Sequence, residues 1–209
     1  MARDLLPLFP LQAILFPRTQ MPLHIFEDRY KTMIGEALEN STEFGIVLAQ
    51  ERGVVNTGCT AIVSKLMKRY DDGRMDIIVV GRRRFEVYEL DQELEYLRGS
   101  VTFFDDEDTE PPVKAHLEQA IRGYYSCRTI EGAAPLPDPD LNDPQLSFQL
   151  AQAVPELEFR QALLSIRSEA ERLKHLAKFF PPYISKQKQQ AHFRKIVPQN
   201  GHGKLKEEA

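Results

Sequence analysis

Residues 5–30, LLPLFPLQAILFPRTQMPLHIFEDRY, alternate prolines with large apolar side chains and constrain the fold more than any other segment. Four prolines divide the run: Pro7, Pro10, Pro17 and Pro22. Because proline removes a backbone donor and fixes φ, we expect no regular helix or central strand here. Short, kinked extended pieces should precede a helix that begins at Glu27 and Asp28. Most of the apolar side chains should form core, and edge segments should leave some exposed where an extended peptide can bind.

Short runs of apolar and β-branched residues, separated by turn signals, follow in the first half of the chain. They predict strands at residues 43–51, 59–69, 75–80, 84–90 and 97–104. Asp72-Gly73 should form a turn, and Gly81 should interrupt the strand that follows it. One amphipathic helix is expected at residues 27–39. Strands at this spacing are typical of a small barrel or sandwich.

The second half has helical spacing instead. Residues 105–112, DDEDTEPP, predict a solvated linker, because like charges and prolines rarely lie inside a packed element. Helices are expected at residues 113–124 and 144–154, and as two pieces from 159 to 180 with a fresh start at the capping-box residue Ser168. Pro181-Pro182 should end the last of these, before a separate basic helix at 183–197. The expected domains are 1–110, a β-rich barrel, 111–198, a helical bundle, and 199–209, a flexible tail.

The composition bounds the class of protein. The chain of 209 residues is 42% hydrophobic, which is enough for a buried core. Cys59 and Cys127 are too few for a secreted disulfide framework, and the N-terminus is neither a signal peptide nor a membrane span, so we expect a cytoplasmic protein. Residues 1–110 carry 13 Lys and Arg against 20 Asp and Glu, a balance that argues against a nucleic-acid partner. The positive excess after Pro182 predicts a local contact for an acidic partner.

The proline-rich run also resembles a known family. Its pieces at residues 7–11 (PLFPL), 15–17 (LFP) and 22–30 (PLHIFEDRY) are similar to the opening of the Lon N-terminal domain, the substrate-recognition region of ATP-dependent Lon proteases. Gly81–Phe85 matches the family's G-x-x-R-F pattern, and Glu158–Leu164 matches one of its bundle helices. The resemblance implies an α+β fold, in which a β-rich PUA-like pseudo-barrel with one helix is followed by a C-terminal α-helical bundle.

The catalytic motifs of full-length Lon proteases are not found in the sequence. A P-loop needs G-x-x-x-x-G-K-[ST], and the nearest approach, Gly203-Lys204-Leu205, has leucine after the lysine. Ser64-Lys65 and Ser185-Lys186 lack the context of a peptidase dyad. The cysteines and the five histidines lack metal-ligand spacing. We therefore expect no enzyme, no metal and no cofactor, in a stand-alone member of the family without the ATPase and peptidase modules.

Arg82-Arg83-Arg84 is the sharpest basic cluster in the sequence. Strand alternation should send Arg82 and Arg84 to one face and Arg83 to the other, as a solvated face or in ion pairs. Such cations can orient a peptide that binds to exposed apolar residues nearby. Expected exposure gives these candidate peptide-binding residues: Pro22, His24, Phe26, Tyr30, Met67, Arg82 and Arg84.

The leading hypothesis is a non-catalytic recognition module. Its resemblance implies that it binds unfolded or apolar polypeptide, or a partner protein, in connection with proteolysis or protein quality control. The alternative is an adaptor or scaffold that docks on a protease or chaperone through the helical half. A small-ligand binder in the barrel mouth, or an unrecognised enzyme, ranks last. The sequence leaves open the partner, the oligomeric state and any cooperation with a separate protease.

Overall fold

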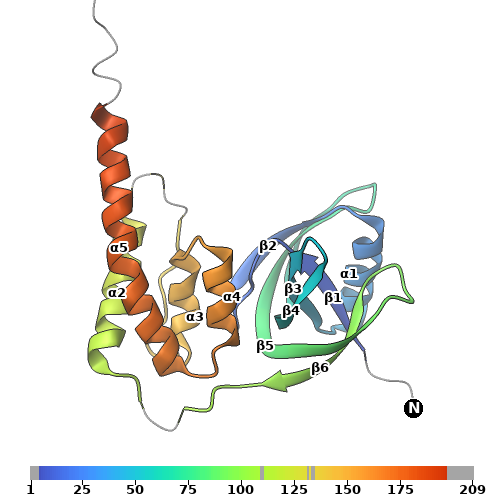
Figure 1. Cartoon of the computed structure of the whole chain (residues 1–209). Helices are drawn as coiled ribbons and strands as arrows, with labels where there is room; N and C mark the ends of the chain where they lie inside the picture. Colours follow the sequence, from blue (N-terminus) through green and yellow to red (C-terminus); the bar gives the residue numbers. More distant parts are fainter. Residues whose placement is uncertain (1–4, 109–110, 131, 133–134, 197–209) are drawn as a thin grey trace, which may run out of the picture.

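The computed structural model describes residues 5–108, 111–130, 132 and 135–196, with side chains up to residue 191. Within these ranges the chain forms a barrel lobe and a helical lobe (Figure 1). The barrel lobe contains β1 (Leu6–Leu11), β2 (Gln20–Ile25), α1 (Asp28–Asn40), β3 (Phe44–Gln50), β4 (Gly53–Arg69), β5 (Met75–Asp91) and β6 (Arg98–Phe104). The helical lobe contains α2 (Lys114–Arg128), α3 (Leu146–Leu150), a 3-10 turn (Ala151–Ala153), α4 (Leu157–Ser165) and α5 (Glu169–Ile196). The predicted α+β class is confirmed.

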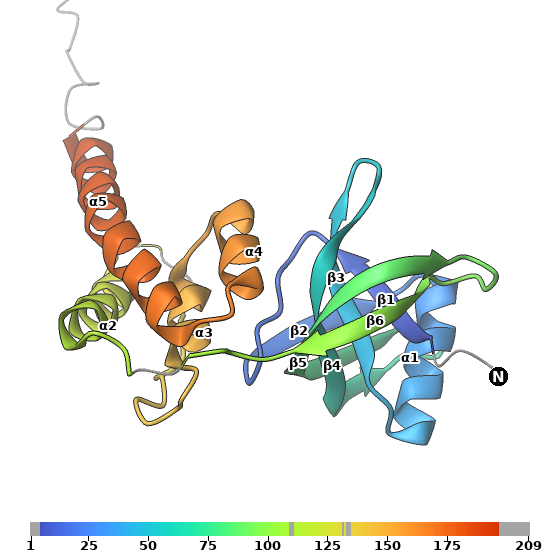
Figure 2. The same cartoon turned by 60° about the horizontal axis from the view of Figure 1, so that its bottom comes forward.

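The strands form one sheet in the order β2-β5-β4-β3-β1-β6, and a second pairing of β6 with β5 closes five of them into a barrel. The first part of β5, residues 75–80, pairs with β2, and its second part, residues 84–91, pairs with β6. β2 therefore lies outside the closed ring and has an open outer edge. Figure 2 shows the two lobes side by side, connected by the extended segment that follows β6.

β1 contradicts the expectation that its prolines would keep it out of the sheet interior. It pairs with β3 from Leu8 onward and with β6 only before that residue, so the two ladders barely overlap. Pro7 precedes the β3 ladder. The Leu8 amide donates to the Leu97 carbonyl at 2.7 Å, and by alternation the nitrogen of Pro10 faces the same side, beyond the N-terminal end of β6. Neither proline leaves a neighbouring strand without a donor.

Gly81 does not interrupt a strand as predicted, since β5 runs unbroken through it. It marks a close crossing of the chain instead. Its amide donates to the Thr19 carbonyl at 3.0 Å, and a Cβ placed on it would lie 2.1 Å from the Phe16 carbonyl oxygen. Glycine is therefore required where residues 15–19 cross β5.

One hydrophobic core extends through both lobes. Met33 and Ile34 on the buried face of α1 pack against the strands of the barrel. Phe148 of α3 and Phe180 of α5 are fully buried in the helical lobe. The ring of Phe16, from the crossing segment, stacks on Phe148 with 5.5 Å between ring centroids. The lobes are thus packed against each other rather than tethered by a linker.

The helical lobe confirms the fresh start at Ser168, whose hydroxyl accepts a hydrogen bond from the Glu171 amide at 3.0 Å. α3 begins two residues after Pro144, later than expected. The prediction that Pro181-Pro182 ends a helix is wrong, because α5 continues to Ile196. Packing on both sides of the prolines compensates for the lost donors: Phe180 is fully buried, and Tyr183 stacks on Phe179 at 5.3 Å.

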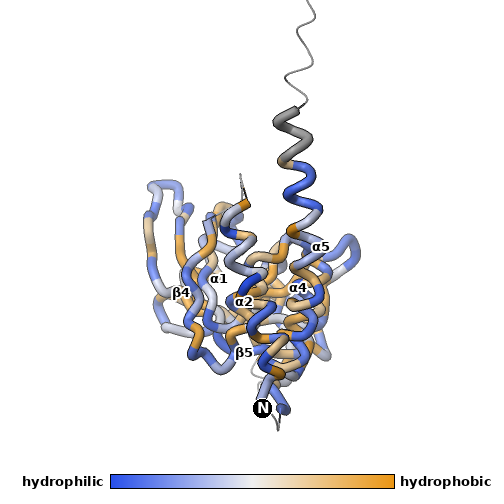
Figure 3. Tube along the Cα trace, turned by 90° about the vertical axis from the view of Figure 1, so that its left-hand side faces the viewer, coloured by the Kyte–Doolittle hydropathy of each residue, from blue (hydrophilic) through white to orange (hydrophobic). Residues whose placement is uncertain are grey.

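The end of α5 projects from the helical lobe, and hydrophilic residues prevail along that part (Figure 3). The expected basic helix is thus the continuation of α5, with Lys186 and Lys188 on it. The expected tail at 199–209 lies outside the described residues. The boundary between residues 110 and 111 stays a prediction, because residues 109 and 110 also lie outside them.

Candidate functional site

Most of the predicted binding residues lie on the outer side of β2, β5 and the second half of β4. β2 pairs with β5 without a register shift, with Pro22 opposite Ile78 and His24 opposite Asp76. Because alternate residues of a strand share a face, Pro22 and His24 point outward together, and both are exposed. We call the exposed set the β2 face. It consists of Pro22, His24, Phe26, Met67 and Arg82.

The β2 face exposes two large apolar side chains. The side chain of Phe26, just after β2, is 59% exposed, and its ring lies 6.0 Å from the ring of His24 in a stacked arrangement. Met67 is 54% exposed and lies in β4 where the pairing with β5 shifts register. Large apolar side chains that are exposed close together mark interaction sites.

A polar cluster holds His24 in place on this face. Its Nδ1 lies 2.6 Å from one oxygen of the Asp76 carboxylate, and the Tyr70 hydroxyl donates to the other oxygen at 2.7 Å. The hydrogen bond from His24 lowers the pKa of Asp76, and the hydrogen bond to Asp76 raises the pKa of Tyr70. Within the described residues, no serine, threonine or cysteine side chain is hydrogen-bonded to His24. The cluster therefore orients the imidazole and forms no nucleophile–base pair.

The arginine run does not alternate as predicted. The β4–β5 register shifts just after Gly81, so that β5 carries one extra residue there. This bulge leaves Arg82 and Arg83 both exposed and turns Arg84 inward. Arg83 pairs with Glu43 at 3.2 Å, whereas Arg82 makes no ion pair among the described residues. Arg82 is therefore a cation on the β2 face that is available to a ligand.

Two of the predicted binding residues lie elsewhere. Tyr30 on α1 is 6% exposed, and its ring packs against that of Phe9 at 4.2 Å. Arg84 is 1% exposed and contacts the helical lobe. Tyr30 lines a separate hollow of about 620 Å³ beside α1, and Arg84 is enclosed at the junction of the lobes, so neither residue lies on the surface that the other five share. Exposure was inferred from local pattern, which does not show the barrel closing over Tyr30 or the bulge before Arg84.

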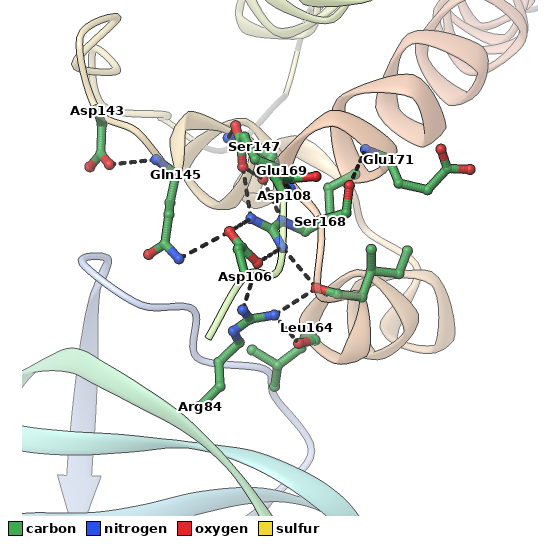
Figure 4. Close-up of polar contacts among 12 residues, drawn as sticks. Arg84, Asp106, Asp108, Asp143, Gln145, Ser147, Leu164, Ser168, Glu169 and Glu171 are labelled. Carbon is green, nitrogen blue, oxygen red and sulfur yellow. Dashed lines mark hydrogen bonds and ion pairs between the residues drawn. The ribbon is translucent and has the colours of Figure 1, made fainter. Parts of the chain in front are cut away.

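Arg84 belongs to a buried polar network that joins the two lobes (Figure 4). Its guanidinium donates to the Leu164 carbonyl at 3.2 Å, the Ile166 carbonyl at 2.6 Å and the Asp106 carboxylate at 2.7 Å. Arg172 of α5 is fully buried and donates to both oxygens of that carboxylate, each at 2.6 Å. Asp106 thus bridges an arginine of the barrel lobe and an arginine of the helical lobe.

The network extends along α5 to α3. Arg172 also donates to the Ser147 hydroxyl at 2.7 Å and to the Glu169 carboxylate at 2.8 Å. Burial opposes ionisation of Asp106, but the hydrogen bonds and charge of Arg172, with the charge of Arg84, outweigh it and lower its pKa. At Glu169 burial prevails and raises the pKa. Removing one partner from such a network leaves a buried charge unpaired, so the network holds the lobes in one arrangement.

The acidic segment was expected to be a solvated linker, and most of its described residues are exposed, but its carboxylates also bind the helical lobe. Besides Asp106, Glu107 pairs with Arg167 at 3.0 Å, and the Asp108 carboxylate accepts a hydrogen bond from the amide at the start of α5. One feature of the sequence could have revealed that this segment binds the helical lobe. Arg172 lies at helical spacing within an apolar stripe, and a cation there needs a carboxylate partner. The run at 105–110 is the densest source of carboxylates.

A cleft of about 550 Å³ opens beside this junction, and its lining combines five acidic side chains with leucines and prolines. Four of its five carboxylates are engaged: Asp143 accepts from Arg18 at 2.7 Å, Asp108 caps α5, and Asp106 and Glu169 accept from Arg172. In the described part of the chain, no group of three His, Cys, Asp or Glu side chains could hold a metal ion. We therefore assign the cleft to the junction and not to a ligand.

Neither cysteine thiol is in an environment that makes it reactive. Both cysteines are buried, and burial raises the pKa of Cys59 to about 12 and that of Cys127 to about 11. Both thiols stay protonated at neutral pH and are poor nucleophiles and metal ligands.

Across the described ranges, every helix lacks the apolar length that crossing a bilayer requires.

The closed barrel and the helical lobe packed on it define a fold class, a PUA-like barrel with a helical extension. The family model for the ATP-dependent protease La (LON) substrate-binding domain matches residues 5–181, and the chain belongs to this family. This confirms the resemblance seen in residues 5–30. The match is to the substrate-binding domain and not to the ATPase or peptidase domains.

Two related proteins support the assignment to this family. The chain is 30% identical to Lon protease from Parabacteroides distasonis over 149 residues, which cover 66% of this chain and 18% of that protein. It is 29% identical to Lon protease 2 from Myxococcus xanthus over 120 residues, 53% of this chain and 14% of that protein. The chain thus spans less than a fifth of these relatives.

Two solved structures share the fold. A Lon N-terminal domain protein from Xanthomonas campestris superposes with a TM-score of 0.67 at 22% identity, covering 85% of this chain and 99% of that chain. The N-terminal domain of Mycobacterium avium complex Lon protease gives a TM-score of 0.57 at 17% identity, covering 84% of this chain and 97% of that chain.

Proposed function

We propose that this protein is a non-catalytic recognition module that binds unfolded or partly apolar polypeptide on the β2 face, in the cytoplasm and in connection with proteolysis. The observation that carries the proposal is the exposure of Phe26 and Met67, 59% and 54%, on either side of β5. The family of substrate-binding domains supports polypeptide as the ligand. No nucleic acid, membrane or cofactor enters the proposal.

The β2 face offers each kind of contact that a polypeptide needs. Phe26 and Met67 can cover apolar side chains of the ligand. Asp76 already holds the imidazole of His24 in place, so binding a ligand there loses little side-chain entropy. Arg82 can pair with a carboxylate or carbonyl. The buried network at the junction keeps the helical lobe fixed, so binding here needs no rearrangement of the lobes.

A fluorescence-anisotropy titration with a labelled, reduced and alkylated unfolded protein tests the proposal. We expect saturable binding that an unlabelled apolar peptide displaces. Phe26→Ala should weaken binding, whereas Tyr88→Ala, which removes an aromatic ring that is 70% exposed elsewhere on β5, should not. Absence of saturable binding, or equal weakening by both variants, would contradict the proposal.

The second candidate is docking on a protease or chaperone through the helical lobe. It is favoured by a stack of half-buried rings, in which Phe159 and Phe179 lie 4.8 Å apart and Phe179 and Tyr183 lie 5.3 Å apart. A hollow of about 310 Å³ beside it is lined by prolines and Lys186. A comparison of partners captured by the full protein and by Tyr183→Ala tests this role. An unchanged partner set would argue against it.

A further inference from the structure

The outer edge of β2 is one of two edges of the sheet that have no partner strand among the described residues. β2 stands at the end of the strand order, and in the described part of the chain it pairs with β5 alone. Its six residues, QMPLHI, pair in continuous register from Gln20 to Ile25 and include no charged side chain. An open edge presents unpaired backbone donors and acceptors that can receive another strand.

The second open edge, on the C-terminal half of β4, is protected against strand addition. The half of β4 beyond Ala61 is not covered by β3, but its register with β5 shifts at Lys65 and again at Lys68. Bulges and edge lysines are the devices by which proteins prevent strand addition. β2 has neither device, and carries only Pro22.

Pro22 shows which backbone groups of β2 face outward. A proline inside a sheet stands where its nitrogen points away from the neighbouring strand. Since pairing directions alternate along an antiparallel strand, the amides and carbonyls of Gln20 and His24 share the outward direction with Pro22. The edge therefore offers donors at residues 20 and 24 and acceptors at 20, 22 and 24. Pro22 itself offers no donor.

Side chains at the two ends of β2 set the chemistry of the incoming segment. Phe26 follows its C-terminal end with 59% exposure. Arg82 lies beyond its N-terminal end, since Gln20 pairs with Val80 and alternation places Val80 and Arg82 on one side of β5. Arg82 is exposed and has no ion-pair partner among the described residues. The six residues of β2 span about 20 Å between the two ends.

We infer that an extended polypeptide segment adds to β2 as an extra strand, with an apolar side chain against Phe26 and an acidic side chain near Arg82. This inference rests on the proposed function and specifies its binding mode and ligand class. Backbone pairing gives tolerance for different sequences, while the Phe26 and Arg82 ends select segments that are apolar at one end and acidic at the other.

Backbone N-methylation of a peptide ligand tests strand addition without altering the protein. The probe is a capped ten-residue peptide of alternating valine and threonine, with phenylalanine near one end and two glutamates near the other. In an added strand only every second amide faces β2. Methylating one alternate set should weaken binding at least tenfold, and methylating the other set should leave it within about twofold.

Matched variants test the edge from the protein side. Gln20→Pro removes an outward donor and should weaken peptide binding several-fold, while Gln20→Ala keeps the donor and should not. A peptide with lysines in place of the two glutamates should bind the native protein more weakly. The same lysine peptide should bind the Arg82→Glu variant more tightly than the glutamate peptide does. Urea midpoints show whether each variant is folded, and the methylated peptides serve as the test if Gln20→Pro is not.

The outcomes separate this inference from the proposed function. If the unmodified peptide binds and the two methylated sets behave alike, strand addition is overturned and peptide recognition on the β2 face stands. If neither the peptide nor an unfolded protein binds, the proposed function fails and the inference fails with it. A difference between the two methylated sets supports strand addition.

Discussion

Arg82 and Arg84 stand two residues apart on β5, yet they belong to opposite kinds of surface. Arg84 is 1% exposed and is hydrogen-bonded to Asp106 and to two carbonyls of the helical lobe. Arg82 is exposed and makes no ion pair among the described residues. One extra residue in the strand separates them. The same residue type thus locks the lobes together on one side of the bulge and is available to a ligand on the other.

The largest expected effect follows from breaking the junction. Arg172→Met leaves the carboxylates of Asp106 and Glu169 buried without their main cation, and we expect a loss of about 3–5 kcal/mol in unfolding free energy. Urea denaturation at pH 7 measures it. Arg82→Met is the control and should leave the midpoint unchanged. Equal stability of the two variants would contradict the contrast between junction and β2 face.

Acid should weaken the junction through Asp106. Because its pKa is lowered in the folded state, the unfolded chain binds more protons below the ordinary value of 3.8, and stability is lost as pH falls from that value through the lowered pKa. Asp106→Asn should lower the free energy of unfolding by about 1.5–3 kcal/mol at neutral pH. The variant should also lose the part of the pH dependence that this carboxyl causes in acid. Glu169 acts in the opposite direction, since its raised pKa makes stability fall as pH rises above 4.5.

Urea midpoints between pH 3 and pH 6 measure both slopes. Glu169→Gln serves as the matched control, because it should remove the falling limb above 4.5 and retain the acid slope. An acid slope that persists unchanged in Asp106→Asn would show that the junction does not depend on that carboxylate.

On the β2 face, changes should affect binding and not stability. Phe26→Ala should weaken binding of an apolar peptide about tenfold, the equivalent of about 1.4 kcal/mol, because a large apolar contact is lost. Thermal denaturation should show no change, since Phe26 is 59% exposed. Tyr88→Ala, with 70% exposure, is the matched control for binding. A destabilised Phe26→Ala protein would mean that the ring serves the core.

The smallest expected effect concerns charge. Arg82→Glu should weaken binding of an acidic peptide about threefold at low salt, and the difference should shrink as salt screens the exposed charge. Arg52→Glu, on the exposed turn between β3 and β4, is the control. Titrations at two ionic strengths measure both. A salt-independent effect of Arg82→Glu would indicate a structural role.

The sequence predicted the parts of this fold that depend on local pattern. The helix at 27–39, the turn at Asp72-Gly73 and the cap at Ser168 follow from periodicity, turn chemistry and side-chain capping, and the structure confirms them. It missed what depends on three-dimensional context. Pro7 and Pro10 fit a central strand only because two ladders meet end to end, and α5 passes Pro181-Pro182 only because aromatic rings pack on both sides.

The candidate site shows the same division. The exposure of Pro22, His24 and Phe26 follows from an edge strand with a proline, which the sequence shows directly. Arg84 and Tyr30 were misplaced because a bulge and the closure of a barrel leave no signal in local pattern. The role of Asp106 was missed because its two arginine partners lie 22 and 66 residues away.

Chemical-shift mapping tests the central claim most directly. A 15N-labelled sample of the protein is titrated with the capped valine–threonine peptide, and amide shifts are followed residue by residue. The account predicts that the shifts concentrate at residues 20–26, 65–70 and 76–82. Shifts centred on the acidic cleft at 105–108 and 141–146, or on the aromatic stack at 155–159 and 179–187, would contradict it.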